Sequence, residues 1–87
     1  MAYEVRLKAS AAGAVEKLPP AIRRRVIAKA ETLADDPRPP DAKKLKGSED
    51  TYRVRAGDYR IIYRVEDDCL VVLVIRVGHR REVYRDL

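Results

Sequence analysis

Residues 52–66, YRVRAGDYRIIYRVE, decide the fold of this 87-residue chain. Apolar and charged side chains alternate on both sides of Gly57-Asp58, which is typical of two β-strands joined by a tight turn. In such a hairpin Arg55 lies opposite Arg60. The residues of the other parity are expected to face a core, and they are Tyr52, Val54, Ile61 and Tyr63.

Three arginines are expected to share one side of this hairpin. Arg53 is predicted to lie opposite Ile62, on the same side as Arg55 and Arg60, and we call these three arginines the arginine face. Directly opposed like charges destabilise a sheet. A chain with no use for such a pair can avoid it easily, so the arginine face is predicted to meet an anion.

A third strand is expected at residues 69–77, after a turn at residues 66–68. This second hairpin would place Ile75 beside Arg60. Because the strand is apolar on both faces, it is expected inside the sheet, with helices on one side and the C-terminal tail or a partner on the other.

The end of the third strand offers two further candidates for the arginine face. If the alternation continues past Val77, His79 joins that face. If Gly78 interrupts the alternation, Arg80 turns inward instead. The residues alone leave this choice open.

The first half of the chain predicts a strand at residues 3–7 and two helices. Ser10 is a candidate N-cap for the first helix, which Pro19 ends, and Pro20 suits the first turn of the second. The second helix carries an apolar stripe made of Ile22, Val26, Ile27, Ala30 and Leu33. Residues 37–51, rich in proline and lysine, predict a basic connector.

The predicted order is therefore βααβββ. We expect an α+β fold in which the helical hairpin packs on one face of a small, antiparallel-rich sheet. A chain of 87 residues has room for one domain, residues 1–87.

The composition of the chain limits the kinds of partner and of catalytic chemistry to be expected. The formal net charge of +5 favours a polyanionic partner without identifying it. One histidine and one cysteine are too few for a Cys/His zinc site, so we expect metal-free chemistry without a cofactor. Cys69 is expected to be a small buried residue at the head of an apolar strand.

The sequence contains no signal-peptide pattern and no apolar run long enough to cross a bilayer, which predicts a cytoplasmic protein without a membrane partner.

Tyrosine directly precedes arginine at residues 52, 59, 63 and 84. Basic groups with nearby aromatic rings can hold phosphates and stack bases. The first three tyrosines have core parity, so packing is their simpler role. Tyr84 follows the strands and is open to a substrate contact or a packing role. The connector lysines are open between solvation and phosphate contact, and they are Lys43, Lys44 and Lys46.

Together these motifs resemble a known family. YRVRAGDYRIIYRVEDD at residues 52–68, followed by VVLVIRVGHRREVYR at residues 71–85, is similar to the RelE/ParE superfamily of type II toxins. More narrowly, the pattern resembles the ribosome-dependent RelE branch. The likeness extends to the opening strand, the helical hairpin and the connector that ends in KKLKG.

The resemblance implies an endoribonuclease, or mRNA interferase, that enters the ribosomal A site. There the nucleotide's own 2′-hydroxyl would attack the adjacent phosphate, which Arg53, Arg55 and Arg60 would hold. Arg80 would stabilise the developing charge or help protonate the leaving oxygen, and Tyr84 would orient or stack the substrate base. Further RNA contacts are expected from Lys43, Lys44, Lys46, Arg64 and Arg81.

The resemblance also implies a cognate antitoxin that wraps and silences the toxin. The toxin would be a monomer alone or part of a hetero-oligomer with its antitoxin. Two rival functions remain open. One is a ParE-like module that blocks DNA gyrase without cleaving RNA, and the other is a non-toxic relative that only binds an antitoxin.

The chain departs from the family at the positions of Arg53 and Arg55, where lysine is common. Arginine effectively cannot lose its proton, so these two residues are poor candidates for a base. Histidine is the side chain that titrates nearest neutrality. We therefore hypothesise that His79 transfers a proton, the alternative being that it only caps the end of a strand.

Overall fold

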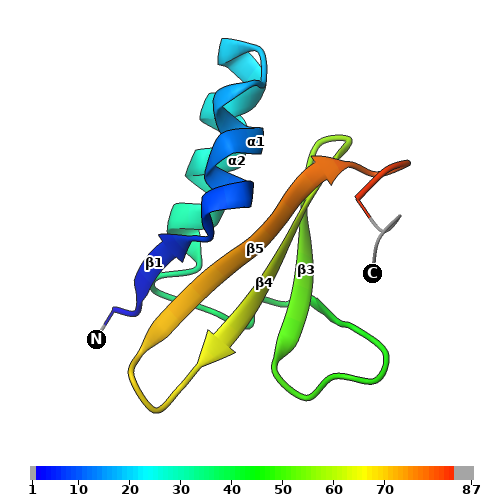
Figure 1. The fold of residues 1–87 in the computed structure, drawn as a ribbon. Coiled ribbons are helices and arrows are strands. Elements are labelled where there is room, and N and C mark those ends of the chain that lie inside the picture. Colours follow the sequence, from blue (N-terminus) through cyan, green and yellow to red (C-terminus); the bar gives the residue numbers. More distant parts are fainter. Residues whose placement is uncertain (1, 84–87) are drawn as a thin grey trace.

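The computed structural model describes residues 2–83 as two helices packed on one face of a five-stranded sheet (Figure 1). The elements are β1 (Glu4–Leu7), α1 (Ala9–Glu16), α2 (Pro20–Thr32), β2 (Lys43–Lys44), β3 (Thr51–Ala56), β4 (Tyr59–Glu66) and β5 (Val71–His79). The strand order is β1-β5-β4-β3-β2, and only the β1–β5 pair is parallel. The predicted α+β fold is confirmed, with the short β2 added in the connector. Neither helix of the described chain is long and apolar enough to cross a membrane.

Prolines set the boundary between the helices. Pro19 is the N-cap of α2 and Pro20 its first residue, where the fixed φ of proline suits the helix and its missing N–H costs no hydrogen bond. The predicted capping role of Ser10 is wrong, because α1 already begins at Ala9 with Lys8 as its N-cap and no side-chain cap. The backbone N–H of Lys8 donates to the carbonyl of Val74 at 2.8 Å, so docking on β5 fixes the start of α1.

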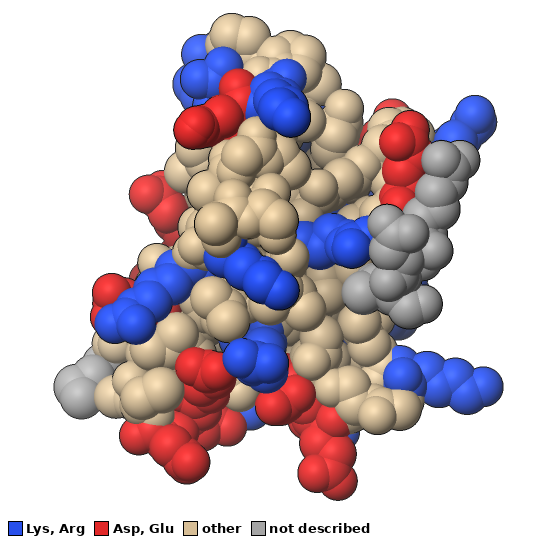
Figure 2. All heavy atoms as spheres, viewed as in Figure 1, with Lys and Arg blue, Asp and Glu red and all other residues tan. Residues whose placement is uncertain are grey.

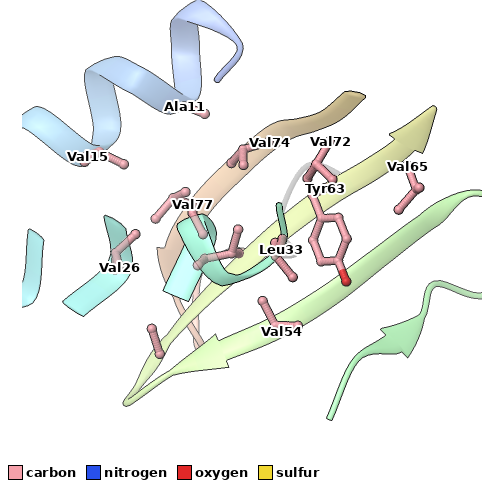
Figure 3. Packing of buried hydrophobic residues seen from close by; sticks show 13 residues of the cluster. Ala11, Val15, Val26, Leu33, Val54, Tyr63, Val65, Val72, Val74 and Val77 are labelled. Atoms are coloured by element: carbon pink, nitrogen blue, oxygen red, sulfur yellow. The ribbon is translucent and has the colours of Figure 1, made fainter. Parts of the chain in front are cut away.

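The core lies between the helices and the sheet (Figure 3). Its least exposed side chains come from both layers and include Val26, Leu33, Val54, Ile61, Tyr63, Val72 and Val74. The Tyr63 hydroxyl donates to the carbonyl of Pro37 at 2.7 Å, which gives this buried phenol a partner. Burial raises the pKa of Tyr63 above its usual range. Tyr52 and Tyr59 pack against the same cluster, so the predicted core parity of these tyrosines is confirmed.

The β3–β4 hairpin has the predicted register. Arg55 pairs with Arg60 and Arg53 with Ile62. The turn uses Gly57 at a φ of 64°, in the left-handed region that glycine enters without steric cost.

The β4–β5 hairpin has a different register from the predicted one. Ile62 pairs with Arg76 whereas Tyr63 pairs with Val74, so Ile75 is an extra residue in a β-bulge. Arg60 consequently lies opposite Gly78 and not opposite Ile75. A shift of one residue moves every later side chain of β5 to the other face of the sheet.

The strand after the second turn also begins later than expected. β5 starts at Val71, and residues 67–70 form the turn. Cys69 is therefore exposed, and its predicted burial is wrong. The predicted internal place of this strand is confirmed, because β5 lies between β1 and β4.

Two tyrosines and an ion pair fasten the connector to the sheet. The carboxylate of Asp67 accepts hydrogen bonds from the Tyr3 hydroxyl at 2.6 Å and from Arg38 Nη2 at 2.7 Å. Arg38 Nε also donates to the Tyr52 hydroxyl at 3.0 Å. The guanidinium of Arg38 and the Tyr3 hydroxyl hold the pKa of Asp67 below its usual value. The connector is thereby fixed just before the segment that leads into β2.

Candidate functional site

A shallow pocket of about 190 Å³ lies where the connector and β2 meet the β3–β4 hairpin. It gathers all three residues of the arginine face together with one connector lysine and one carboxylate. The lining residues are Asp41, Lys43, Arg53, Val54, Arg55 and Arg60. We call this the cationic pocket.

Strand pairing positions the four cations of this pocket. Lys43 is the cross-strand partner of Arg53, and Arg55 is the partner of Arg60. The Cβ atoms of such partners are about 4.5–5.5 Å apart, so the charges are held together by the backbone ladder itself. An anion that binds here relieves the repulsion between like charges.

The turn of the hairpin also fixes one guanidinium. Arg60 Nη1 donates to the carbonyl of Gly57 at 3.2 Å and to that of Tyr59 at 3.3 Å. A guanidinium restrained in this way loses less conformational entropy when it binds a phosphate. Its planar array of N–H donors matches the geometry of phosphate oxygens.

The sequence predictions did not single out Asp41 or Lys29. Asp41 lines the cationic pocket and forms an ion pair with Lys29 of α2, at 2.8 Å between Oδ2 and Nζ. Lys29 holds the pKa of the Asp41 carboxyl below its usual value. The sequence did hold one indication, because Asp41 is two residues before Lys43 and would share its face in an extended segment. However, the preceding Pro39-Pro40 predicts a loop, in which side-chain alternation carries no information.

His79 lies on the opposite side of the sheet from the arginine face. Its cross-strand partner is Tyr59, and the two rings meet edge to face with centroids 5.5 Å apart. Nδ1 of His79 accepts the backbone N–H of Arg81 at 3.2 Å. The predicted arginine-face position of His79 is wrong because the bulge at Ile75 reverses the alternation. The hypothesis that His79 transfers a proton was based on that position, so it no longer has support.

The backbone of Arg80 is held at the β3–β4 turn. Its N–H donates to the carbonyl of Asp58 at 2.8 Å, which places the residue beside the β3–β4 turn. Val83, the last described residue, is buried, and a Cβ added at Gly78 would lie 3.4 Å from its side chain. The described part of the tail, which ends at Val83, therefore covers part of β5, one of the two kinds of cover that the sequence left open. Tyr84 lies outside the described residues.

The remaining predicted contacts lie outside the cationic pocket. Lys44 pairs with Tyr52, so it points to the other face of the sheet from Lys43, and Lys46 is exposed beyond β2. Arg64 has the parity of Arg60, but two of its nitrogens donate to Glu66 Oε2 at 3.1 and 3.0 Å. Arg81 is exposed in the turn after β5.

Charge is unevenly distributed over the molecule. Figure 2 shows many acidic side chains gathered at the end that carries the β4–β5 turn, whereas lysines and arginines spread over much of the rest of the visible face. A hollow at that acidic end is lined by Asp50, Val65, Glu66, Asp67, Asp68 and Cys69. A polyanion is therefore repelled from this acidic end. Among residues 2–83, no three His, Cys, Asp or Glu side chains are grouped so that they could hold a metal ion.

A family model described as the ParE toxin of the type II toxin-antitoxin system parDE matches residues 5–84. This match covers both helices, all of the sheet except Glu4, and every residue of the cationic pocket. The chain belongs to the RelE/ParE superfamily of type II toxins.

Relatives within the superfamily carry RelE-type names. The chain is 36% identical over 90 residues to the mRNA interferase toxin RelE of Escherichia coli K12, covering 99% of this chain and 94% of the relative. It is also 36% identical over 89 residues to Toxin RelG of Mycobacterium tuberculosis, covering 98% of this chain and 99% of the relative.

Solved structures of the superfamily have the same fold. The RelBE2 toxin-antitoxin complex of Mycobacterium tuberculosis matches with a TM-score of 0.81 and 34% identity, over 92% of this chain and all of that one. The superfamily assignment predicted from residues 52–85 is confirmed.

Proposed function

We propose that this chain is a RelE-type toxin that cleaves messenger RNA in the ribosomal A site. The observation that carries the proposal is the cationic pocket, which gathers Arg53, Arg55 and Arg60 with Lys43. Support comes from the Escherichia coli relative, whose name describes an mRNA interferase and which aligns with nearly the whole chain.

The proposed reaction is attack by a ribose 2′-hydroxyl on the adjacent phosphate. Negative charge grows on the phosphate oxygens during this attack, and donors fixed beforehand stabilise the transition state more than the ground state. Arg53, Arg55 and Arg60 take this role, and they supply the positive charge that a metal ion provides in other nucleases. The reaction is accordingly proposed to need no metal and no other cofactor.

Other residues have supporting roles in the proposal. Arg80, beside the β3–β4 turn, stabilises the developing charge or helps protonate the leaving oxygen. Tyr84 orients or stacks the substrate base. Contacts to the phosphates of the message or of ribosomal RNA come from Lys43, Lys44, Lys46, Arg64 and Arg81. We propose no role for His79 in the chemistry. Its proposed role is structural, at the end of β5.

The proposed physiological partner is a cognate antitoxin, with which the toxin forms a hetero-oligomer. The structural relative from Mycobacterium tuberculosis is a toxin-antitoxin complex, and its toxin fold superimposes on nearly all of this chain. We propose that the toxin acts in the cytoplasm, where its ribosomal target is found.

A ParE-type activity is the second candidate, because the matching family model is described as a ParE toxin. Such a toxin would bind DNA gyrase and leave RNA intact. A supercoiling assay with purified gyrase distinguishes the two, since inhibition at low toxin concentration would favour the ParE-type function. The RelE-type function is preferred because it gives the cationic pocket a substrate.

The decisive experiment adds the purified chain to translating ribosomes and maps the 5′ ends of the message. We expect cuts at A-site codons in the wild type and their loss in Arg60→Ala. Arg6→Ala is the matched control, because Arg6 is an exposed arginine of the same sheet that pairs with Glu4 on the far edge. Intact message with the wild-type chain would refute the proposal.

A further inference from the structure

The cationic pocket contains one charged group without a role in the reaction proposed above. Asp41 lies in the connector ahead of β2 and lines the pocket together with Lys43 and the arginine face. Its carboxylate oxygen Oδ2 is held 2.8 Å from Lys29 Nζ. An acidic side chain weakens the binding of a phosphate by repulsion. Its presence among four cations therefore calls for a chemical reason.

The reaction needs a proton acceptor, and the cations of the pocket do not provide one. The 2′-hydroxyl must lose its proton as its oxygen bonds to phosphorus. Arginine effectively never deprotonates, and a lysine ammonium has three donors and no acceptor. His79 lies on the other face of the sheet against Tyr59. Asp41 is the one carboxylate among the residues that line this pocket.

We propose that the Asp41 carboxylate accepts the proton of the attacking 2′-hydroxyl. This inference rests on the proposed function and names the general base of that reaction. The 2′-oxygen forms a bond to phosphorus while the bond from phosphorus to the 5′-oxygen breaks. The 2′-proton moves to Asp41, and the departing 5′-oxygen takes a proton from solvent or another donor. The products are a 2′,3′-cyclic phosphate and a 5′-hydroxyl.

Charged groups around Asp41 keep it in the form that such a base needs. Lys29 approaches it from α2 at 2.8 Å. The other charged residues that line the same pocket come from β2, β3 and β4, namely Lys43, Arg53, Arg55 and Arg60. Lys29 lowers the pKa of Asp41, so the carboxylate is ionised at neutral pH and can only accept hydrogen bonds. The ion pair reduces basicity, but it also fixes the direction of the carboxylate.

The test is the pH dependence of single-turnover cleavage on programmed ribosomes between about pH 6 and pH 9, a range above the ordinary carboxyl pKa. In the wild type the base is ionised throughout, so the rate should be nearly independent of pH. Asp41→Asn should lose at least about 10²-fold in rate near neutrality. Its remaining rate should rise about tenfold per pH unit, because hydroxide then removes the proton.

Lys29→Gln separates the carboxylate from the ion pair. This variant removes the same contact and keeps the base, so its rate should stay within about tenfold of wild type with a flat pH profile. Asp68→Asn, which removes an exposed carboxylate at the distant β4–β5 turn, should leave the rate unchanged. The ion pair lies at the surface, and thermal melting should confirm that all three variants are folded.

The outcomes distinguish failure of this inference from failure of the proposed function. If the wild type cuts the message and Arg60→Ala does not, but Asp41→Asn cuts at the wild-type rate, the function stands and the inference is overturned. Equal losses in Asp41→Asn and Lys29→Gln, both with flat profiles, would also overturn it, because Asp41 would then only hold the connector. No cleavage by the wild type overturns both proposals.

Discussion

The two hairpins that share β4 are built differently. From Thr51 to Ala56, β3 pairs with β4 without interruption, and a short turn at Gly57 closes the hairpin. The pairing of β4 with β5 is broken by the bulge at Ile75, and the turn at residues 67–70 includes Leu70 at a φ of 55°. The first hairpin is regular, and the second is deformed at its turn and in the middle of its ladder.

This difference decides which side chains reach the proposed substrate. The unbroken ladder keeps Arg53, Arg55 and Arg60 on one face, where they share a pocket. The bulge turns His79 away toward Tyr59. Bulges often re-aim side chains beside active sites. The arginine face therefore belongs wholly to the regular hairpin, and the following variants test this difference between the two hairpins.

The largest expected effect is on cleavage, from Arg55→Ala in the regular hairpin. Loss of one fixed donor to the transition state should lower the single-turnover rate about 10²–10³-fold. The measurement is cleavage of message on programmed ribosomes. Arg24→Ala, at an exposed position of α2, is the control. A rate for Arg55→Ala close to wild type would remove Arg55 from the proposed site.

The next effect is on stability, from Gly57→Ala in the turn of the regular hairpin. The left-handed backbone at Gly57 should make alanine cost about 1–2 kcal/mol of unfolding free energy. The added Cβ would also lie 2.9 Å from Arg25 Nη1, the flexible end of a side chain that can move away. Urea denaturation measures the loss.

Gly13→Ala is the matched control for this variant. A Cβ at Gly13 meets no atom within 4 Å, and the residue lies inside α1. Alanine there should gain about 0.5–1 kcal/mol, because glycine is the poorer helix former. If both variants lose the same stability, the left-handed φ of Gly57 is not what the hairpin requires.

A smaller effect, of opposite sign, is expected from Leu70→Asn in the deformed hairpin. Asparagine enters the left-handed region more readily than leucine, so this variant should gain up to about 1 kcal/mol despite the loss of apolar contact. Leu7→Asn is the control, because Leu7 is 37% exposed against 38% for Leu70 but lies in the extended strand β1. Leu7→Asn should lose stability in urea, and a similar loss in Leu70→Asn would refute the strain at that turn.

The same two hairpins explain how far the sequence could predict the fold. In the first hairpin, Gly57-Asp58 marks the turn, and an alternation interrupted only at Ile62 means that a slip of one residue would bury the arginines. In the second, residues 70–75 are apolar on both faces, so no register is penalised and the bulge leaves no trace in the pattern. The errors at Cys69 and His79 both follow from this missing signal.

The cationic pocket was predictable only in part, for a related reason. Strand parity placed the three arginines together. Asp41 belongs to a proline-rich connector, whose path depends on contacts with distant parts of the chain, such as those of Arg38 with Asp67 and Tyr52. No periodic pattern encodes such contacts, so the position of Asp41 required the structure.

The smallest expected effect on cleavage comes from His79→Gln, which tests directly whether the deformed hairpin takes part in the chemistry. His79 pairs with Tyr59 on the helix side, so its loss should change the cleavage rate by less than about twofold while Arg55→Ala loses about 10²-fold or more. Loss of the ring contact should instead lower the unfolding free energy by about 0.5–1.5 kcal/mol. A large fall in cleavage by a folded His79→Gln variant would mean that the deformed hairpin does supply the proton carrier. It would also remove the argument that leaves this role to Asp41.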